Sequence, residues 1–260
     1  MDVRMDGRVA IVTGGSKGIG LAIVRAFAES GATVAMLARD AGTLDAAVAA
    51  LAQDGHAGVR AYPCDVSQAD AVAATHARIV GDLGDVDILV NNAGTSRTMA
   101  FESITDEAWQ ADLDLKLFAA IRLSRLVWPG MRDKGRGRII NVLNTYAKAP
   151  RAGSAPTSVS RAAGLALTKV MAGEGAPHGI LVNALLVGLI HSDQWVQRHA
   201  ANAPDTPYEE FARKLAAGVP VGRMGEAREF ADLACFLASD KGSYVTGTAI
   251  NVDGGMSPVT

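Results

Sequence analysis

The chain has 260 residues, of which 49% are hydrophobic, so it can bury the core of one large domain. Its formal net charge of −2 gives no electrostatic reason to expect nucleic acid or an anionic membrane as a partner. Cys64 and Cys235 are too few for a disulfide framework or a metal cluster, so we expect two reduced, buried thiols and no metal. No apolar run suits a signal peptide or approaches the roughly 20 residues of a membrane span, so we expect a cytoplasmic protein.

The N-terminal residues predict a strand, a glycine-rich turn and a helix in direct succession. The run VAIVT at 9–13 is rich in β-branched residues, as in a strand buried on both faces. GGSKGIG follows, and apolar residues then recur at helical spacing until Gly31. Such a turn lets the backbone approach a pyrophosphate, and the helix N-terminus supplies N–H donors; the alternative is a tight turn without a ligand. The residues expected to bind a dinucleotide here are Gly14, Ser16, Lys17, Gly18, Ile19 and Gly20.

A residue just past the second predicted strand (33–37) indicates which dinucleotide binds. In this kind of fold that residue lies near the adenosine ribose, where an acidic side chain would accept the 2′-hydroxyl of NAD. Here the residue is Arg39, and Lys17 lies in the glycine turn. Two cations suit a 2′-phosphate, so we expect NADP(H). The alternative is that Arg39 is a solvated surface residue, and Asp40 beside it weakens the case slightly.

Later segments repeat the same alternation of strands and helices. We expect a helix at 44–51 and strands at 59–63 and 86–90. Alternation at this spacing predicts a parallel sheet with right-handed crossovers, and ligands bind at the carboxyl ends of its strands. Asp65 follows one of these ends and could accept a hydrogen bond from an adenine amino group.

Five motifs, in order and at consistent spacing, make the chain resemble the short-chain dehydrogenase/reductase family over nearly its whole length. They are TGGSKGIG at 13–20, DV at 65–66, NNAG at 91–94, GRMG at 222–225 and VDGG at 252–255.

The resemblance implies a single doubly wound α/β domain over 1–260, with a seven-stranded parallel sheet and helices on both faces. It also implies a nicotinamide cofactor, a small-molecule substrate, and a homodimer or homotetramer in which a strand at 245–252 often lies at a subunit interface. The further cofactor contacts that it implies are Asp65, Val66, Asn91, Ala93, Gly94, Arg161, Gly188 and Ser192.

The resemblance also places the catalytic positions, where this chain departs from the family's Asn–Ser–Tyr–Lys tetrad. Asn144 stands where the family has Ser, after a predicted strand at 138–143. Thirteen residues later Thr157 stands in place of Tyr, and four residues further Arg161 stands in place of Lys. Lys116 occupies the position of Asn, seven residues after Trp109.

These side chains cannot perform the family's proton transfer in the same way. The hydroxyl of Thr157 is far less acidic than a phenol, whose pKa is about 10, and its side chain is shorter. Arg161 stays protonated, so it can hold ribose hydroxyls but cannot relay a proton. The amide of Asn144 could polarise a carbonyl weakly, and Lys116 adds a titratable cation. Losing an acid–base partner costs about 10²–10⁴-fold, so we do not expect ordinary carbonyl reduction.

Other candidate acids lie nearby in the sequence. Tyr146 and Lys148 follow Asn144 and could enter the site, or could simply shape its rim. His191 could be an acid near neutral pH, or one residue of a mobile substrate lid that we expect at 193–219. Arg97 could bind an anionic group of the substrate, or lie on the surface.

Three functions fit these observations. The first is an atypical NADP(H)-dependent oxidoreductase that reduces a small imine, an activated carbonyl or a polarised C=C bond without the usual Tyr acid. The second is a dehydratase, isomerase or cyclase that uses Lys116, Tyr146 or His191. The third is an inactive cofactor-binding protein that stabilises a catalytic partner. We favour the first because a retained nicotinamide site is hardest to explain without hydride transfer.

Overall fold

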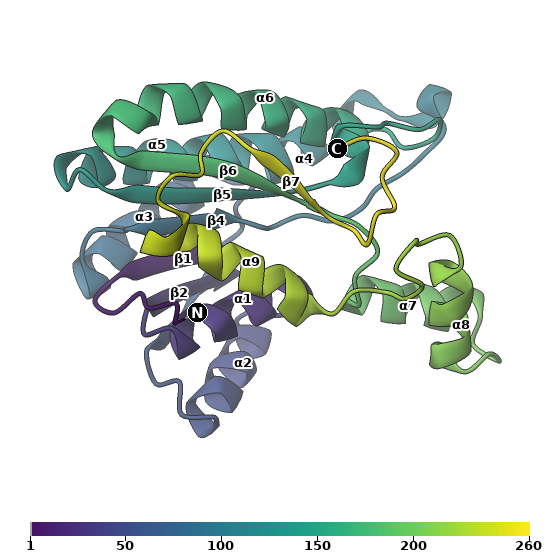
Figure 1. Ribbon diagram of the computed structural model, residues 1–260, viewed down its shortest axis with the longest axis horizontal. Helices are drawn as coiled ribbons and strands as arrows, with labels where there is room; N and C mark the ends of the chain where they lie inside the picture. The colour runs from purple at the N-terminus through teal and green to yellow at the C-terminus, as the bar shows by residue number, and fades with distance from the viewer. Residues whose placement is uncertain (1) are drawn as a thin grey trace.

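Seven parallel strands form one sheet with helices on both faces, in a computed structural model that describes residues 2–260 (Figure 1). The strand order is β3-β2-β1-β4-β5-β6-β7, and every neighbouring pair is parallel. The chain therefore builds outward from β1 in one direction and then returns to build outward in the other. The point of reversal, between β1 and β4, is where ligands bind in such sheets. The predicted fold class is confirmed.

The strands and helices follow the predicted alternation. The strands are β1 (Val9–Thr13), β2 (Thr33–Ala38), β3 (Val59–Pro63), β4 (Ile88–Asn91), β5 (Gly137–Asn144), β6 (Ile180–Val187) and β7 (Ala249–Val252). The helices are α1 (Gly18–Glu29), α2 (Ala41–Gln53), α3 (Ala69–Leu83), α4 (Asp106–Leu113), α5 (Ala119–Asp133), α6 (Thr157–Gly175), α7 (Asp193–Asn202), α8 (Tyr208–Ala216) and α9 (Ala227–Ala238).

Two of the boundaries that differ from the sequence-based expectation have a clear physical cause. Helix α2 begins earlier than predicted because Asp40 caps it: its carboxylate accepts a hydrogen bond from the Thr43 N–H at 2.7 Å. Strand β7 is shorter than the predicted strand at 245–252 because Gly247 has a φ of 67°, which lies outside strand geometry.

Burial on both faces explains why β1 is an unbroken apolar run. Ala10 and Val12 point to the layer that contains α1, α2 and α9. Val9 and Ile11 point to the opposite layer, which contains α3, α5 and α6. Successive side chains alternate across a strand, so both layers receive apolar residues from β1. Burying each large aliphatic side chain contributes about 1.5–3 kcal/mol.

An irregular helical segment connects α4 to α5. The segment η2 (Asp114–Phe118) is π-helical and continuous with both helices. Such segments are rare and often lie at functional sites. Lys116 lies within it and is buried. The sequence pattern did not indicate this irregularity.

Helices α7 and α8 project from one end of the sheet, beyond β6 (Figure 1). They contribute to a small apolar cluster, separate from the two main layers, that includes Leu189, Ala212 and Val219. These helices occupy the segment predicted as a substrate lid. No helix among residues 2–260 is long and apolar enough to cross a membrane.

Candidate active site

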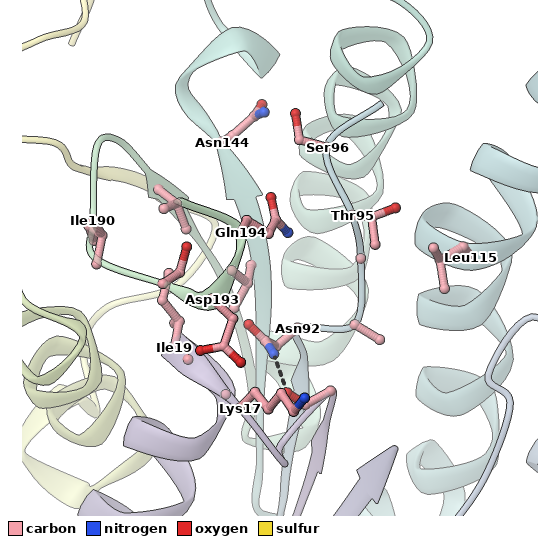
Figure 2. Close-up of a pocket in the computed structure, with 18 of the residues that line it drawn as sticks. Lys17, Ile19, Asn92, Thr95, Ser96, Leu115, Asn144, Ile190, Asp193 and Gln194 are labelled. Atoms are coloured by element: carbon pink, nitrogen blue, oxygen red, sulfur yellow. Dashed lines mark hydrogen bonds between the residues drawn. The ribbon is translucent and has the colours of Figure 1, made fainter. Parts of the chain in front are cut away.

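A cavity of about 690 Å³ lies at the carboxyl ends of the strands (Figure 2). The segments that follow the first six strands all contribute to its walls, and α7 closes one side. Figure 2 shows Lys17 and Asp193 at one end of this cavity, with Asn144 and Ser96 at the other. The cavity thus lies at the edge of the sheet where the sequence analysis expects a ligand, the carboxyl ends of the strands.

The glycine turn forms a tight backbone cradle at the start of α1. A Cβ on Gly20 would collide with the carbonyl oxygen of Gly14, and Gly18 has a φ of 53°. Asn92 stabilises the turn, since its Nδ2 donates to the carbonyl oxygens of Thr13 and Gly14 at 2.9 and 3.2 Å. The N-cap residue Lys17 makes no side-chain cap, so the first N–H groups of α1 are available to an anion. This geometry fits a dinucleotide pyrophosphate.

Positively charged side chains line the part of the cavity near the end of β2, where the adenosine of a dinucleotide would lie. Lys17 and Arg39 are both at its wall. Asp40 is also at the wall, and its Oδ1 accepts hydrogen bonds from the Thr43 N–H and hydroxyl at the start of α2. The hydrogen bond from the Thr43 hydroxyl, with a smaller contribution from the charge of Lys17, lowers the pKa of Asp40. Asp65 is at the wall and accepts hydrogen bonds from the Ser67 N–H and hydroxyl.

The amide that faces the cavity after β4 is Asn92 rather than the predicted Asn91. The side chain of Asn91 is buried, and its Nδ2 donates to Oδ1 of Asn141 at 2.9 Å. Strand alternation sends neighbouring side chains to opposite sides, which explains the difference. Ala93 and Gly94, two of the predicted cofactor contacts, line the cavity.

Asn144 is the last residue of β5, and its amide faces the cavity (Figure 2). Its Oδ1 is buried and has no hydrogen-bond partner within the described residues. Tyr146, in the short helix η3 (Thr145–Ala147), also lines the cavity, and the guanidinium of Arg151 lies 5.0 Å from its ring centre. An amide and a phenol therefore both lie at the wall of this end of the cavity.

Arg161 places a buried positive charge in the same region. Its Nη1 donates to the carbonyl oxygen of Val142, and its Nε is buried without a partner in the described chain. Gly94 leaves room for it, since a Cβ there would lie 2.6 Å from Nη2. Burial lowers the pKa of Arg161 to about 10, and the charge of Asp112 opposes this shift. The guanidinium remains protonated at neutral pH.

Lys116 does not line the main cavity but lies behind Thr157, at the wall of a second, much smaller cavity. Its Nζ donates to Asp112 and, at 2.9 Å, to Oγ1 of Thr157. Ser160 donates to the other oxygen of Asp112 at 2.6 Å. Burial, opposed by the hydrogen bond to Asp112 and reinforced by the charges of Arg161 and Arg97, lowers the pKa of Lys116 to about 8.

Asp112 and Ser160 were not identified from the sequence. Asp112 lies on a helix with many polar residues, where nothing in the pattern marks it as buried. Its exposure is 1%, so its charge needs the partners that η2 and α6 bring to it.

The lid side of the cavity differs in part from the prediction. Ser192 lines the cavity directly beside Gly18 of the glycine turn. Gly188 is required where it is, because a Cβ would collide with Asp253. His191 points elsewhere: its Nδ1 lies 3.0 Å from the Tyr208 hydroxyl, and its ring is outside the cavity wall. Five lid residues that follow Ser192 also line the cavity: Asp193, Gln194, Trp195, Gln197 and Arg198.

Two other sequence candidates also lie away from the cavity. Lys148 donates to the carbonyl oxygen of Ala249 at 2.6 Å. The side chain of Arg97 is exposed, while its backbone is bound to Thr157. The structure thus brings together Asn144, Tyr146, Thr157 and Arg161, and does not bring Lys148, Arg97 or His191 to the cavity wall.

Comparisons with known proteins agree with this geometry. A family model described as enoyl-(acyl carrier protein) reductase matches residues 14–257. The acetoacetyl-CoA reductase of Shinella zoogloeoides is 38% identical over 248 residues, covering 95% of this chain and 98% of that protein. The structure of L-sorbose reductase from Gluconobacter frateurii, complexed with NADPH and L-sorbose, superposes with a TM-score of 0.94 at 34% identity and covers 100% of both chains.

A third similar protein is an NADPH-bound short chain oxidoreductase from Pseudomonas aeruginosa PAO1. It superposes with a TM-score of 0.92 at 40% identity, covers 99% of both chains, and is described as containing an atypical catalytic center.

Proposed function

Because the chain belongs to the short-chain dehydrogenase/reductase family and is an NADP(H)-dependent oxidoreductase, we propose that it reduces a small, already activated substrate without a tyrosine acid. The substrate classes that fit are an iminium, an activated carbonyl and a polarised C=C bond. Each accepts hydride readily, so each needs little proton donation in the transition state.

The observation that carries this proposal is the state of Thr157. It stands where the family has its tyrosine, thirteen residues after Asn144. Its hydroxyl donates to the carbonyl oxygen of Arg97 at 2.6 Å, and the residue is only 1% exposed. Neither its acidity nor its position suits proton transfer to a substrate in the cavity. The neighbouring positions, Lys116, Asn144 and Arg161, also carry residue types other than those of the family's tetrad.

The chain offers groups that bind and polarise rather than protonate. NADPH, when bound, supplies the hydride. The Nδ2 of Asn144 can donate a hydrogen bond to the heteroatom of the substrate, because the residue lines the cavity and this N–H₂ group is the donor end of its amide. Arg161 would hold ribose hydroxyls of the bound cofactor and, for a carbonyl or C=C substrate, would keep a positive charge near the developing negative charge. Tyr146 is the one phenol at the cavity wall, and it supplies a second hydrogen-bond donor at the rim.

The description of the Pseudomonas aeruginosa oxidoreductase supports an unusual site in a close relative that still binds NADPH. The acetoacetyl-CoA reductase similarity supports a reductive direction. The family resemblance further suggests a homodimer or homotetramer, which light scattering of the purified chain would test.

A substrate screen tests the proposal directly. NADPH oxidation is followed with cyclic imines, α-diketones, enones and plain ketones as probes. We expect turnover with at least one activated class and rates about 10²–10⁴-fold lower with plain ketones. Asn144→Ala should lower kcat by about 10–10³-fold while leaving NADPH binding intact.

Two results would contradict the proposal. Absence of NADPH oxidation with every class, by a protein that binds NADPH, would refute the proposal. Conversion of substrate with no net change in NADPH would instead favour the dehydratase, isomerase or cyclase alternative.

A further inference from the structure

The hydroxyl of Thr157 is fully occupied by protein groups. Its Oγ1 accepts hydrogen bonds from the Arg97 N–H at 3.0 Å and from Nζ of Lys116 at 2.9 Å. It donates its single proton to the Arg97 carbonyl oxygen at 2.6 Å. One donated and two accepted bonds exhaust a hydroxyl group. Thr157 therefore binds both backbone groups of one residue, in the segment that follows β4.

That segment forms part of the cavity wall. Thr95 and Ser96 line the cavity, and Figure 2 shows Ser96 at the same end as Asn144. Beyond Thr157, the segment is attached to the chain before α6 by the Met99 N–H, which donates to the Ala155 carbonyl at 3.0 Å. Few other contacts can fix it, since residues 95–100 are exposed.

A buried charge pair holds Thr157 from behind. The side chains of Lys116 and Asp112 are each 1% exposed, and Ser160 satisfies the second oxygen of Asp112. The π-helical turn of η2 carries Lys116 to this position. A continuous series of hydrogen bonds thus joins Ser160, Asp112, Lys116 and Thr157 to the backbone of Arg97.

We propose that Asp112, Lys116 and Thr157 are positioning residues that hold the substrate wall formed by Thr95 and Ser96. Two positions that serve proton transfer in the family are, in this chain, used to fix a wall of the site. The meaning of the wall for catalysis rests on the proposed reductase function, but the positioning itself does not.

The charges around Lys116 make the arrangement pH-dependent. Asp112 faces it from α4, Arg161 from α6, and Arg97 from the segment after β4. The pKa of Lys116 is lowered to about 8, so the ammonium loses its proton as the pH rises through that value. The charge-assisted bonds to Asp112 and Thr157 then weaken, and the wall should loosen. Removing the Asp112 charge takes away a group that raises the pKa, which moves the transition to lower pH.

Hydrogen–deuterium exchange on the full chain with NADP⁺ bound tests the proposal without any substrate. Thr157→Val should reduce the protection of residues 95–100 by about tenfold, and Thr157→Ser, which keeps the hydroxyl, should retain it. The matched control is Thr168→Val, a second buried threonine of α6, whose hydroxyl donates to Gly164 and does not touch this segment. It should leave the protection of 95–100 unchanged.

The pH series adds a readout that a purely structural role would not move. Protection factors of residues 95–100 should fall between about pH 7 and 9 in the natural chain and at lower pH in Asp112→Asn. In Lys116→Met they should not depend on pH. Unchanged protection in Thr157→Val, or an identical pH series in Lys116→Met, would overturn the proposal.

Kinetics separate this inference from the proposed function. With a substrate from the screen, Thr157→Val should raise KM and change kcat by less than tenfold. A collapse of kcat at unchanged KM, restored by Thr157→Ser, would show that the hydroxyl transfers a proton and would overturn the positioning role. Failure of the screen leaves the exchange experiment fully informative.

Discussion

Single residues determine which chemistry the cavity can support. Asn144 and Arg161 reach its wall, whereas Lys116 is buried behind Thr157. Burial lowers the pKa of both cations, but only Lys116 approaches the physiological range. The catalytic end of the site therefore offers a positive charge and an amide donor, and the amine of Lys116 is separated from the cavity by the hydroxyl group of Thr157.

If the proposed function is right, a tyrosine in place of Thr157 should increase the rate of ketone reduction. The triple variant Asn144→Ser, Thr157→Tyr, Arg161→Lys introduces the family's residue types at the three positions where the sequence resemblance predicts them. We expect its kcat for a plain ketone to rise by about 10²–10⁴-fold over the natural chain, because a phenol would again donate the proton. The matched control combines Thr157→Phe with Asn144→Ser and Arg161→Lys. It supplies the ring without the hydroxyl and should show no gain in kcat. Equal rates in the two variants would exclude the lost phenol as the cause.

At the scale of elements, the glycine turn and the segment after β4 depend on each other. Thr13 accepts hydrogen bonds from the Asn92 and Ala93 N–H groups, both at 2.9 Å, and Asn92 returns bonds to the turn. This mutual bonding forms the cradle before any ligand binds. Preformed donors lower the entropic cost of binding a dinucleotide.

Gly20→Ala should therefore disrupt cofactor binding. The added Cβ would collide with the Gly14 carbonyl, which is backbone and cannot move aside cheaply. We expect a loss of about 1–3 kcal/mol in the free energy of unfolding and at least tenfold weaker NADPH binding by titration calorimetry. Gly173→Ala in α6 is the control, because its Cβ meets nothing within 4 Å. It should gain stability by about 0.5–1 kcal/mol and bind NADPH normally. Normal NADPH binding by Gly20→Ala would contradict the geometry.

At the scale of the whole molecule, the cavity is closed by segments far apart in the chain. Ser192, which precedes α7, lies against Gly18 of the first glycine turn, and five residues of α7 line the same cavity. A dinucleotide in the cradle would contact both. The lid at 193–219 should consequently respond to the cofactor.

NADP⁺ should slow proteolysis within 193–219, and the same concentration of NAD⁺ should protect less, since Lys17 and Arg39 favour a 2′-phosphate. Mass spectrometry of the fragments after brief trypsin treatment measures the effect. Arg39→Asp should reduce the advantage of NADP⁺ by about tenfold or more. Equal protection by the two cofactors in the natural chain would argue against the role of Arg39.

The sequence by itself determined the fold and predicted the position of the site. Periodicity and glycine spacing are local properties, so strands such as 9–13 and the turn at 14–20 could be recognised from the residues alone. The spacing from Asn144 to Thr157 and Arg161 likewise placed these residues in one region, because all three are carried by β5 and α6.

Only the tertiary structure decided what these residues contact. Contacts between α4, α6 and the segment after β4 bury Asp112 and form the two hydrogen bonds between Thr157 and the backbone of Arg97. The π-helical turn at Lys116 depends on the same contacts. Those contacts join residues more than 40 positions apart, such as Lys116 and Thr157. No local pattern specifies them, because the pairing of buried polar groups is set by how the helices pack against the sheet.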